Sequence, residues 1–568
     1  MDINWKLREA DISFAELHKF SSELNISPVM CLMLHQRGMK TLEDMHFFLN
    51  PGLRYLPPLE TWSGLDKASR IIGQALDKDR KMAVWGDYDV DGITSVALIK
   101  DFFQRRGIDV IPKLPHRVTD GYGLNSHEIE NLAREGVRVL ITVDCGISNL
   151  AEINRAKELG MQVVLTDHHQ PGQNLPRADV ILNPKTENCP HPNLAGVGTA
   201  FFLVAALNRT LPGPALDMRD FLDLVALGTI ADLVELDRSN RILVKNGLLL
   251  LNNSLRPGIN ALKEVSGLED TGTIGAGEVG FALGPRINAA GRLDDPAIAL
   301  ELLLTSNISL AGKLAQQLNR LNDQRKKTEN EILSQAREMA LSMQDQHGLV
   351  LYGPDWHPGV IGIVASRIVD EFHRPCFVLT RDNGLLKGSG RSIQGYNLYH
   401  GLSELASFLE KFGGHSQAAG LSLDPDRLEE FRDGFNKNVR RKLGPAIPRR
   451  TITLDAMLEL PDITPELLME IEMLQPLGPG NPRPVFLSNK LLVMEQTLFG
   501  KNRHVRFTLK DEPSGICLKA IFWRKGQAWS QRDLKGKRLT LAYTPAVNTY
   551  RGVTGIRLNI REILQVAD

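Results

Sequence analysis

Five short apolar runs alternate with helical segments between about Leu65 and Asn183. The runs are rich in β-branched residues, as buried strands are, and they read KMAVWG, DVIPKL, VRVLITV, MQVVLT and ADVILN. Segments of helical pattern, such as HEIENLARE and LAEINRAKELG, lie between them. Strands that alternate with helices predict a parallel, doubly wound sheet, so we expect an α/β fold.

The chain has 568 residues, enough for three or four domains. A long helical pattern without proline, over 306–345, indicates a connecting helix, and a second α/β pattern follows it. Five strand-like runs after Pro484 predict a small barrel, for which the OB-fold is the favoured candidate. The expected division is a helical lead over 1–50, an α/β catalytic domain over 51–305, the connecting helix, a second α/β domain over 346–447 and the barrel domain over 448–568.

The cysteine pattern and the N-terminal sequence indicate the cellular compartment of the protein. Five cysteines occur without a C-x-x-C pair, which fits a reducing compartment and gives no zinc spacing. The N-terminus carries charges where a signal peptide needs an apolar core, and no run of about 20 apolar residues occurs. We therefore expect a cytoplasmic protein without a membrane partner.

The formal net charge of zero hides two unlike parts. Residues 481–568 contain 16 Lys and Arg but only 6 Asp and Glu, a net charge of +10, so the first 480 residues carry −10. Basic grooves with aromatic side chains suit single-stranded nucleic acid, although most of these aromatics could equally form a barrel core. The aromatic residues of this segment are Phe499, Phe507, Phe522, Trp523, Trp529, Tyr543 and Tyr550, interleaved with basic residues such as Lys501, Arg506 and Arg551.

Three consecutive apolar runs end in residue types that bind metals, and a fourth carboxylate follows a helical apolar run. The carboxyl ends of parallel strands meet at one edge of a sheet, where ligands gather. Clustered carboxylates cannot all stay ionised unless cations balance them, and oxygen ligands with an imidazole select Mg²⁺ or Mn²⁺. Two such ions about 3.5 to 4 Å apart would activate a water and clamp a phosphoryl group. The residues are Asp87, Asp89, Asp91, Asp144, Asp167, His168, His169 and Asp232.

Each of these residues also has a plainer interpretation. An aspartate at a strand end is commonly a helix N-cap, but a tandem His168-His169 has no such use. His169 by itself remains open as a metal ligand, a partner of a ligand or a substrate contact.

Glycine-rich segments later in the chain suit phosphate binding. Ser389 and Arg391 lie two residues apart on a predicted Gly-rich loop. Gly414 and His415 precede an Ala-rich segment that predicts a helix start, where backbone N–H groups attract anions. His357 could be a contact or a packed loop histidine. The Gly196-Val197-Gly198 segment favours a closely packed helix start over a nucleotide loop.

An ordered set of motifs over roughly residues 80–425 resembles the DHH phosphoesterase superfamily. The motifs are DYDVDG, VDCG, TDHH, ALGTIADLV, GFALGPRINAAGRL, WHPGVIGIVASR, GSGRS and FGGHSQAAG. Together with the barrel segment, they are similar to the RecJ family of single-strand-specific 5′ to 3′ DNA exonucleases. Two departures are Trp85, where related phosphoesterases often have a histidine ligand, and Cys145, where asparagine is frequent.

The resemblance implies a DHH domain, a DHHA1-type domain and an OB-fold that together degrade single-stranded DNA to 5′-mononucleotides in repair and recombination. It implies two Mn²⁺ or Mg²⁺ ions and partners such as a helicase and a single-stranded-DNA-binding protein, and we expect a monomer. The implied metal ligands are Asp89, Asp91, Asp144, His168 and Asp232, with Asp87 and His169 as catalytic neighbours. The implied substrate-binding residues are Arg117, Arg286, Asn288, Ser389, Arg391, Gly414 and His415.

Two other functions stay open from the residues. A small-substrate phosphoesterase of the same superfamily would act on polyphosphate, cyclic dinucleotides or short oligonucleotides, and it would not need the basic barrel. A non-catalytic repair factor that binds single strands would be expected to lack the metal ligands, which are present here.

Overall fold

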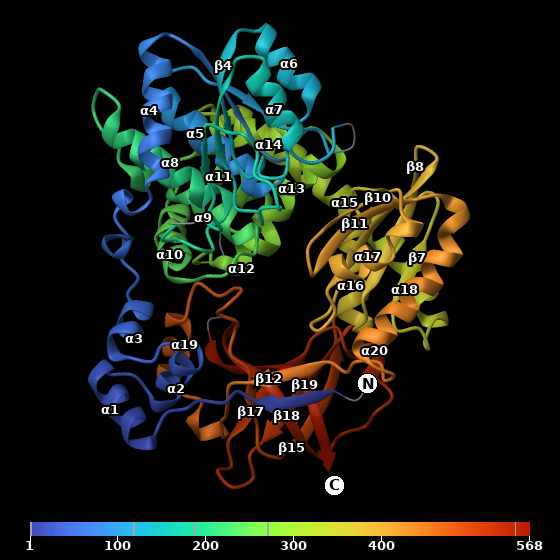
Figure 1. Ribbon diagram of the computed structural model, residues 1–568. Helices are drawn as coiled ribbons and strands as arrows, with labels where there is room; N and C mark the ends of the chain where they lie inside the picture. The colour runs from blue at the N-terminus through green and yellow to red at the C-terminus, as the bar shows by residue number, and fades with distance from the viewer. Residues whose placement is uncertain (1–2, 118–119, 187–188, 270–271, 551–552, 568) are drawn as a thin grey trace. The chain divides into compact units, whose positions relative to one another are not determined.

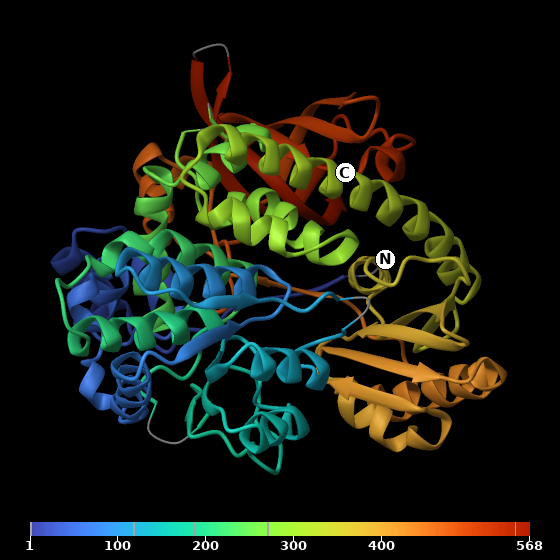
Figure 2. The ribbon, with the colours of Figure 1, turned by 90° about the horizontal axis from the view of Figure 1, so that it is seen from above.

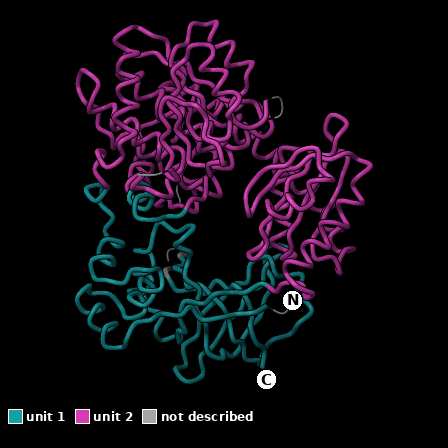
Figure 3. Tube along the Cα trace, in the orientation of Figure 1, with its two compact units in different colours: residues 1–56, 235–245, 450–568 teal, residues 57–234, 246–449 magenta. Residues whose placement is uncertain are grey.

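A computed structural model of the chain describes residues 3–117, 120–186, 189–269, 272–550 and 553–567. It divides into two compact units, each made of separate chain segments (Figure 3). Unit 1 comprises residues 1–56, 235–245 and 450–568, and unit 2 comprises 57–234 and 246–449. Among the described residues, no helix has the length and apolar character needed to cross a membrane.

A five-stranded parallel sheet forms the first half of unit 2, as the alternating pattern predicts (Figure 1). The strand order is β3-β2-β4-β5-β6, so the chain starts near one edge and then crosses the sheet. Leu140 and Val163 on one face and Ile141 and Val164 on the other are fully buried, which explains why these strands have apolar residues on both faces. The strands are β2 (Lys81–Trp85), β3 (Ile111–Lys113), β4 (Val137–Thr142), β5 (Gln162–Thr166) and β6 (Val180–Leu182).

Helices cover this sheet and extend beyond it. Helix α5 (Val90–Arg105) follows β2 and packs against α8 and α9, and almost every residue in its first three turns is buried. The other helices of this half are α4 (Gly64–Asp77), α6 (Ser126–Arg134), α7 (Leu150–Glu158), α8 (Gly196–Thr210), α9 (Leu222–Ala231), α11 (Pro257–Val265), α12 (Ala276–Glu278), α13 (Gly284–Leu293) and α14 (Ala297–Leu304), with a π-helical turn, η4, over Val279–Leu283.

Helix α15 (Ile308–Ser342) joins the two halves of unit 2 (Figure 2). Its first part contacts α11, α13 and α14, and it also contacts β7 and α16 of the second half. The second half is a five-stranded mixed sheet in the order β10-β11-β9-β8-β7. Its elements are β7 (Leu349–Tyr352), α16 (Ile361–Phe372), β8 (Cys376–Asp382), β9 (Leu385–Arg391), α17 (Leu398–Glu404), β10 (Lys411–Gly414), β11 (Ala418–Leu423) and α18 (Leu428–Leu443).

Unit 1 contains the predicted barrel. Strands β15, β16, β17, β19 and β18 pair in a closed ring, in which only β17 and β19 are parallel. This pairing is the five-stranded barrel expected from the sequence. The strands are β15 (Leu491–Phe499), β16 (His504–Lys510), β17 (Cys517–Phe522), β18 (Arg538–Tyr550) and β19 (Val553–Ala567), and β13 (Ala456–Met457) and β14 (Phe486–Leu487) extend the sheet from β18.

The N-terminal helices share a hydrophobic core with the barrel. Met30 and Leu34 belong to the same buried cluster as Phe507 and Tyr543. Strand β1 (Asn4–Leu7) also pairs in parallel with β12 (Thr451–Leu454). The remaining helices of unit 1 are α1 (Phe14–Leu24), α2 (Pro28–Gln36), α3 (Leu42–Leu49), α19 (Pro465–Met473) and α20 (Gly526–Trp529), and α10 (Arg238–Asn252) begins in unit 1.

The aromatic residues of the barrel segment divide into two sets. Phe507, Phe522 and Tyr543 are buried and form core, which is the plainer of the two interpretations. Trp523, by contrast, is 43 % exposed. Arg551 and the side chain of Tyr550 lie outside the described part of the chain.

Candidate metal centre and phosphate-binding residues

Local hydrogen bonds in the loop after β2 fix the Asp89 side chain against the backbone of Asp91 and Gly92. Asp89 is the N-cap of α5, and its Oδ1 accepts from the N–H groups of Asp91 and Gly92 at 3.0 and 3.2 Å. A Cβ atom on Gly92 would lie 2.3 Å from the Asp87 carbonyl oxygen, so this turn needs glycine. Asp89 is therefore a helix cap, as its plainer interpretation predicts, and still lies in the cluster described below.

Asp91 is held by the start of α8. Its carboxylate accepts from the N–H groups of Gly196 and Val197 at 2.6 and 2.8 Å. A Cβ atom on Gly196 would lie 2.6 Å from the Asp144 Cβ, which agrees with the closely packed helix start expected from the sequence. Burial, and then the neighbouring Asp89 charge, raise the pKa of Asp91 to about 7.

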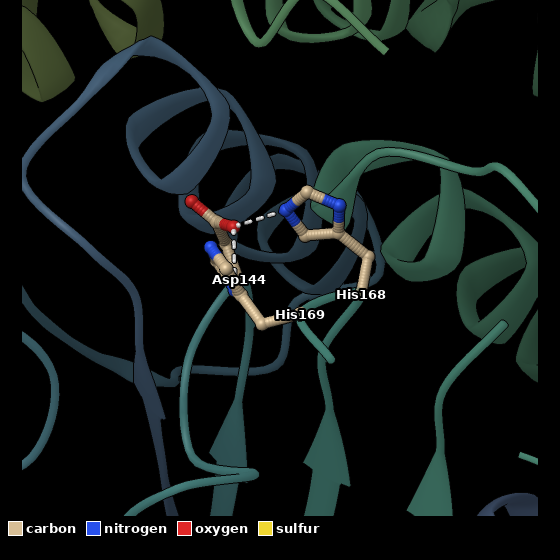
Figure 4. A group of neighbouring side chains, drawn as sticks. All are labelled: Asp144, His168 and His169. Carbon is tan, nitrogen blue, oxygen red and sulfur yellow. Dashed lines mark ion pairs between the residues drawn. The ribbon is translucent and has the colours of Figure 1, made fainter. Parts of the chain in front are cut away.

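His168 faces three carboxylates from three different elements (Figure 4 shows its contact with Asp144). Its Nε2 lies 3.0 Å from Asp144 Oδ1, 3.5 Å from Asp232 Oδ2 and 3.7 Å from Asp91 Oδ2. Burial is the main reason that the pKa of His168 falls to about 3, so the ring is neutral. Neither His168 Nε2 nor Asp232 Oδ2 has a hydrogen-bond partner among the described residues. In the tautomer whose lone pair is on Nε2, this nitrogen faces acceptor oxygens, and a cation between them would stabilise the arrangement, so these atoms fit a divalent metal.

Among the described residues, three groups of side chains could hold metal ions. Within each group, one ligand atom per residue lies within 4.8 Å of the others. Burial is also the main cause that raises the pKa of Asp87, Asp144 and Asp232 well above the ordinary value. The groups are Asp87, Asp89 and Asp144; Asp91, His168 and Asp232; and Asp144, His168 and His169.

His169 is oriented by Asp167. Its Nδ1 lies 2.7 Å from Asp167 Oδ1 and 3.1 Å from the Tyr122 hydroxyl. Burial lowers the pKa of His169, but the hydrogen bond to Asp167 and the negative charges of Asp167, Asp89 and Asp91 together outweigh burial, so the pKa is raised. Asp167 also accepts from the N–H groups of Ile147 and His168. The Asp167 carboxylate thus orients His169 and ties the β5 loop to the β4 loop.

Ser389 and Arg391 lie on strand β9, not on a loop, so the predicted Gly-rich loop is wrong. Alternation along the strand puts both side chains on one face, and Arg391 Nη1 lies 3.3 Å from Ser389 Oγ. A Cβ atom on Gly362, in the first turn of α16, would lie 2.9 Å from Ser389 Oγ and 3.3 Å from Arg391 Nη2. The hydroxyl and the guanidinium therefore lie together over the start of this helix.

The predicted helix start after Gly414 is also wrong. Residues 411–423 form a hairpin of β10 and β11, closed by a hydrogen bond from the His415 N–H to the Ala418 carbonyl at 2.7 Å. Gly414 has a φ of 138°, and a Cβ atom there would lie 2.5 Å from the Ala418 oxygen. The hairpin brings the His415 ring to a stacked position 6.5 Å from the His169 ring.

Arg117, Arg292 and Arg391 are close enough to affect one another. Burial, and then Arg117, lower the pKa of Arg292 to about 9 and also lower the pKa of Arg391. Arg117 stacks over the Tyr88 ring at 4.8 Å, and Arg292 donates to the Gly359 carbonyl at 2.9 Å. No ion pair joins these three guanidinium groups to a described carboxylate, so they offer surplus positive charge beside Asp87 and Asp89.

Three other predicted residues have structural partners. Arg286 bonds Asn319 of α15 and the carbonyls of Ala282 and Val265 rather than the carboxylate cluster. Asn288 accepts from the Val90 N–H at 3.1 Å and so supports the turn that carries Asp89. His357 accepts from the Gly359 N–H, as a packed loop histidine would.

Sequence reasoning did not assign several residues at this site. Asp167 lies in the TDHH motif, which predicts no separate role for it, and Arg292 lies in GPRINAAGRL, from which only Arg286 and Asn288 are predicted to bind substrate. Tyr122 lies beside the predicted Arg117 segment. A signal for Lys185 is present, because it follows β6, the fifth strand of the sheet, as the aspartates follow β2, β4 and β5.

The chain matches three family models, in an order that agrees with the fold. Residues 81–229 match the DHH family N-terminal domain, 345–441 the DHHA1 domain and 454–562 the RecJ OB domain. The single-stranded-DNA-specific exonuclease RecJ of Escherichia coli (strain K12) is 36 % identical to it, over 95 % of this chain and 96 % of that protein. The chain belongs to the RecJ family. The RecJ of Bacillus subtilis (strain 168) is 35 % identical, over 99 % of this chain and 70 % of that protein.

Solved RecJ structures have the same fold. RecJ from Thermus thermophilus in complex with Mn²⁺ matches with a TM-score of 0.85 and 31 % identity, over 99 % of this chain and 79 % of that one. Its complex with Mg²⁺ matches with a TM-score of 0.79 and 29 % identity, over 99 % and 78 %. The predicted α/β fold, with a DHHA1 domain and an OB domain, is thus confirmed for this RecJ family member.

Proposed function

We propose that this protein is a metal-dependent exonuclease that degrades single-stranded DNA from its 5′ end to 5′-mononucleotides, in DNA repair and recombination. The observation that carries the proposal is the position of Nε2 of the neutral His168 ring, which lies within 3.7 Å of three carboxylate oxygens and forms no hydrogen bond with the part of the chain that the structure describes. Such a set of atoms is suited to a divalent cation, and nucleases of this family are named for single-stranded DNA.

The residues have distinct proposed roles. Asp89, Asp91, Asp144, His168 and Asp232 would hold two Mn²⁺ or Mg²⁺ ions, with Asp87 beside them. When bound, the ions would lower the pKa of a water molecule and stabilise charge on the leaving oxygen. Asp167 keeps a proton on His169 Nδ1, which leaves His169 Nε2 for the substrate.

The strand would be positioned by cationic and polar side chains. Arg117 and Arg391 carry charge that no described carboxylate neutralises, and Ser389 adds a hydroxyl beside Arg391. His415 faces His169 across the site. We therefore assign the 5′ end to the β9 strand and the β10–β11 hairpin, including Gly414. Arg286 and Asn288 would contribute indirectly, through α15 and the β2–α5 turn.

The wider setting is also part of the proposal. The protein would act as a cytoplasmic monomer, with the division at residues 50, 305, 345 and 447 expected from the sequence. A helicase and a single-stranded-DNA-binding protein would supply the open strand.

The function is tested with end-labelled single strands and Mn²⁺. We expect the wild type to release mononucleotides from the 5′ end. Asp144→Asn, or His168→Ala, should lose more than about a hundredfold in cleavage, because even outer partners of metal ligands contribute up to that factor. Both variants should keep DNA binding.

Asp77→Asn is the matched control, because this exposed residue lies at the end of α4, before the amino end of β2. Full cleavage by Asp144→Asn would refute the assigned site. Release of labelled mononucleotide from the 3′ end first would refute the proposed polarity. Equal rates on dinucleotides and long strands would favour the small-substrate phosphoesterase.

A further inference from the structure

Strand β6 carries residues to the same edge as the metal centre. It pairs in parallel with β5, with Leu182 opposite Thr166, so the residues after Leu182 lie beside Asp167. Asn183 is fully buried and donates from Nδ2 to the His169 carbonyl at 2.9 Å. Its Oδ1 accepts from the Lys185 N–H at 2.8 Å. The turn that carries Lys185 is therefore tied to the backbone of His169.

The Lys185 ammonium lies among charged groups without pairing to any of them. Its side chain is exposed, and it forms no ion pair or side-chain hydrogen bond within the part of the chain that the structure describes. It opposes the rise in the pKa of Asp232 that burial causes, and it adds to the fall in the pKa of His168 and of His415, for which burial is again the first cause. The ammonium is therefore near enough to Asp232, His168 and His415 to affect all three, and the turn that carries it is fixed beside His169.

We propose that Lys185 binds a backbone phosphate of the single strand between the metal cluster and His415, an assignment that rests on the proposed function. The carboxylates near Lys185 attract its charge only while they are not neutralised. Divalent cations at the cluster would cancel that attraction, and the charge would then be available to a phosphate diester. The anchored turn limits how far the ammonium can move.

The competing role for Lys185 is that of a counter-charge for the aspartates. Both roles place a cation near Asp232, but they differ in what the substitution changes. A counter-charge would alter Mn²⁺ affinity and stability, whereas a phosphate contact would alter DNA binding and its salt dependence.

The test compares Lys185→Met and Lys185→Arg with the wild type in the full-length protein. DNA binding is measured by fluorescence anisotropy in Mn²⁺, with a 5′-phosphorylated oligothymidylate of about 20 nucleotides that carries cleavage-resistant phosphorothioate linkages, over a series of salt concentrations. Steady-state cleavage with Mn²⁺ gives KM and kcat. Mn²⁺ affinity is measured by calorimetry without DNA, and Lys78→Met, before the amino end of β2, is the matched control.

We expect Lys185→Met to raise Kd and KM about tenfold with kcat nearly unchanged, the loss of one charged hydrogen bond. The slope of log K against log salt should become shallower by about 0.7, the value for one phosphate of a single strand. Lys185→Arg should keep most of the binding, and Lys78→Met should match the wild type.

An unchanged Kd, KM and salt slope in Lys185→Met would overturn the assignment, and so would a change confined to Mn²⁺ affinity. A wild-type protein that neither binds nor cleaves single strands would instead refute the proposed function, so the two failures are distinguishable.

Discussion

At the scale of single residues, the metal centre is a set of buried acids that cannot all be ionised by themselves. Asp91 is fully enclosed and accepts two N–H hydrogen bonds, yet burial and Asp89 still raise its pKa to about 7. Burial is also the main reason that the pKa values of Asp144 and Asp232 are raised. Protons and divalent cations therefore compete for this site.

This competition predicts a pH-dependent response to Mn²⁺. Because the folded pKa of Asp91 exceeds its unfolded value, the metal-free protein holds extra protons and loses stability as pH rises through about 7. Mn²⁺ must displace those protons, so its affinity rises over the same range. The gain in Tm from excess Mn²⁺ should be larger at pH 8 than at pH 6, measured by scanning calorimetry against EDTA controls. A gain independent of pH would contradict the raised pKa values.

The close packing around Gly196 predicts that an added methyl group would destabilise the protein. A Cβ atom there would lie 2.6 Å from the Asp144 Cβ and 3.0 Å from Asp91 Oδ2. Gly196→Ala should cost about 1 to 3 kcal/mol of stability, the usual range for overpacking, and weaken Mn²⁺ binding. Gly312→Ala in helix α15 is the matched control, since a Cβ atom there meets nothing within 4 Å. This substitution should raise the free energy of unfolding by about 0.5 to 1 kcal/mol. Equal urea midpoints for the two variants would argue against a crowded α8 start.

At the scale of elements, one arginine joins three segments of unit 1. The Arg241 guanidinium is fully buried and donates to the carbonyls of Phe48, Leu474 and Gln475, among others. It also lies 3.6 Å from the centre of the Phe48 ring. These bonds attach the start of α10 to α3 and to the chain after α19.

Arg241→Met should therefore destabilise unit 1. Several buried carbonyls would lose their donor, at about 1 to 3 kcal/mol for each unpaired group, so a total loss above about 3 kcal/mol is expected in urea unfolding. Arg238→Met is the control: this exposed arginine on the same helix stacks over Phe47 and should cost less than about 1 kcal/mol. A small loss in Arg241→Met would mean that water replaces the guanidinium.

Local sequence predicts some secondary-structure elements correctly and others wrongly. The five apolar runs of the first sheet became five strands, because burial on both faces selects continuous β-branched residues. The GGHSQAAG segment, by contrast, has the composition of a helix start but forms a hairpin. Its β11 strand pairs along its length with β9, and Gly414 adopts a φ that an alanine would not favour. Pairing with a distant strand outweighs local helix propensity there.

At the scale of the whole molecule, the surplus positive charge and the candidate metal centre lie in different units. The last 88 residues carry a net charge of +10 and belong to unit 1, whereas the candidate metal centre lies in unit 2. On the barrel, Trp523 contacts the rings of Phe499 and His504, and its Nε1 donates to Asn559. Arg557 lies over the Trp523 ring. These groups form a basic and aromatic cluster of half-buried side chains around the exposed Trp523.

Trp523→Ala should weaken binding of long single strands. One stacked base contributes about 1 to 3 kcal/mol, so Kd for an oligothymidylate of about 20 nucleotides should rise at least fivefold in anisotropy measurements. Hydrolysis of dinucleotides should not change. Trp5→Ala is the matched control, because Trp5 is similarly exposed on β1 of the same unit. Equal losses in both variants would show that exposed tryptophan alone does not mark the DNA surface.

The sequence by itself determined the α/β class, the order of the domains and the residues at the strand ends, because strand periodicity and the meeting of parallel strand ends are local or topological properties. Only the tertiary structure decided which atoms meet. It brought His168 Nε2 to Asp91, Asp144 and Asp232, turned Arg286 toward α15, and added Arg292 and Lys185 to the site. It also placed residues 1–56 and 235–245 with the barrel. Such contacts depend on packing between segments tens to hundreds of residues apart, which no local pattern records.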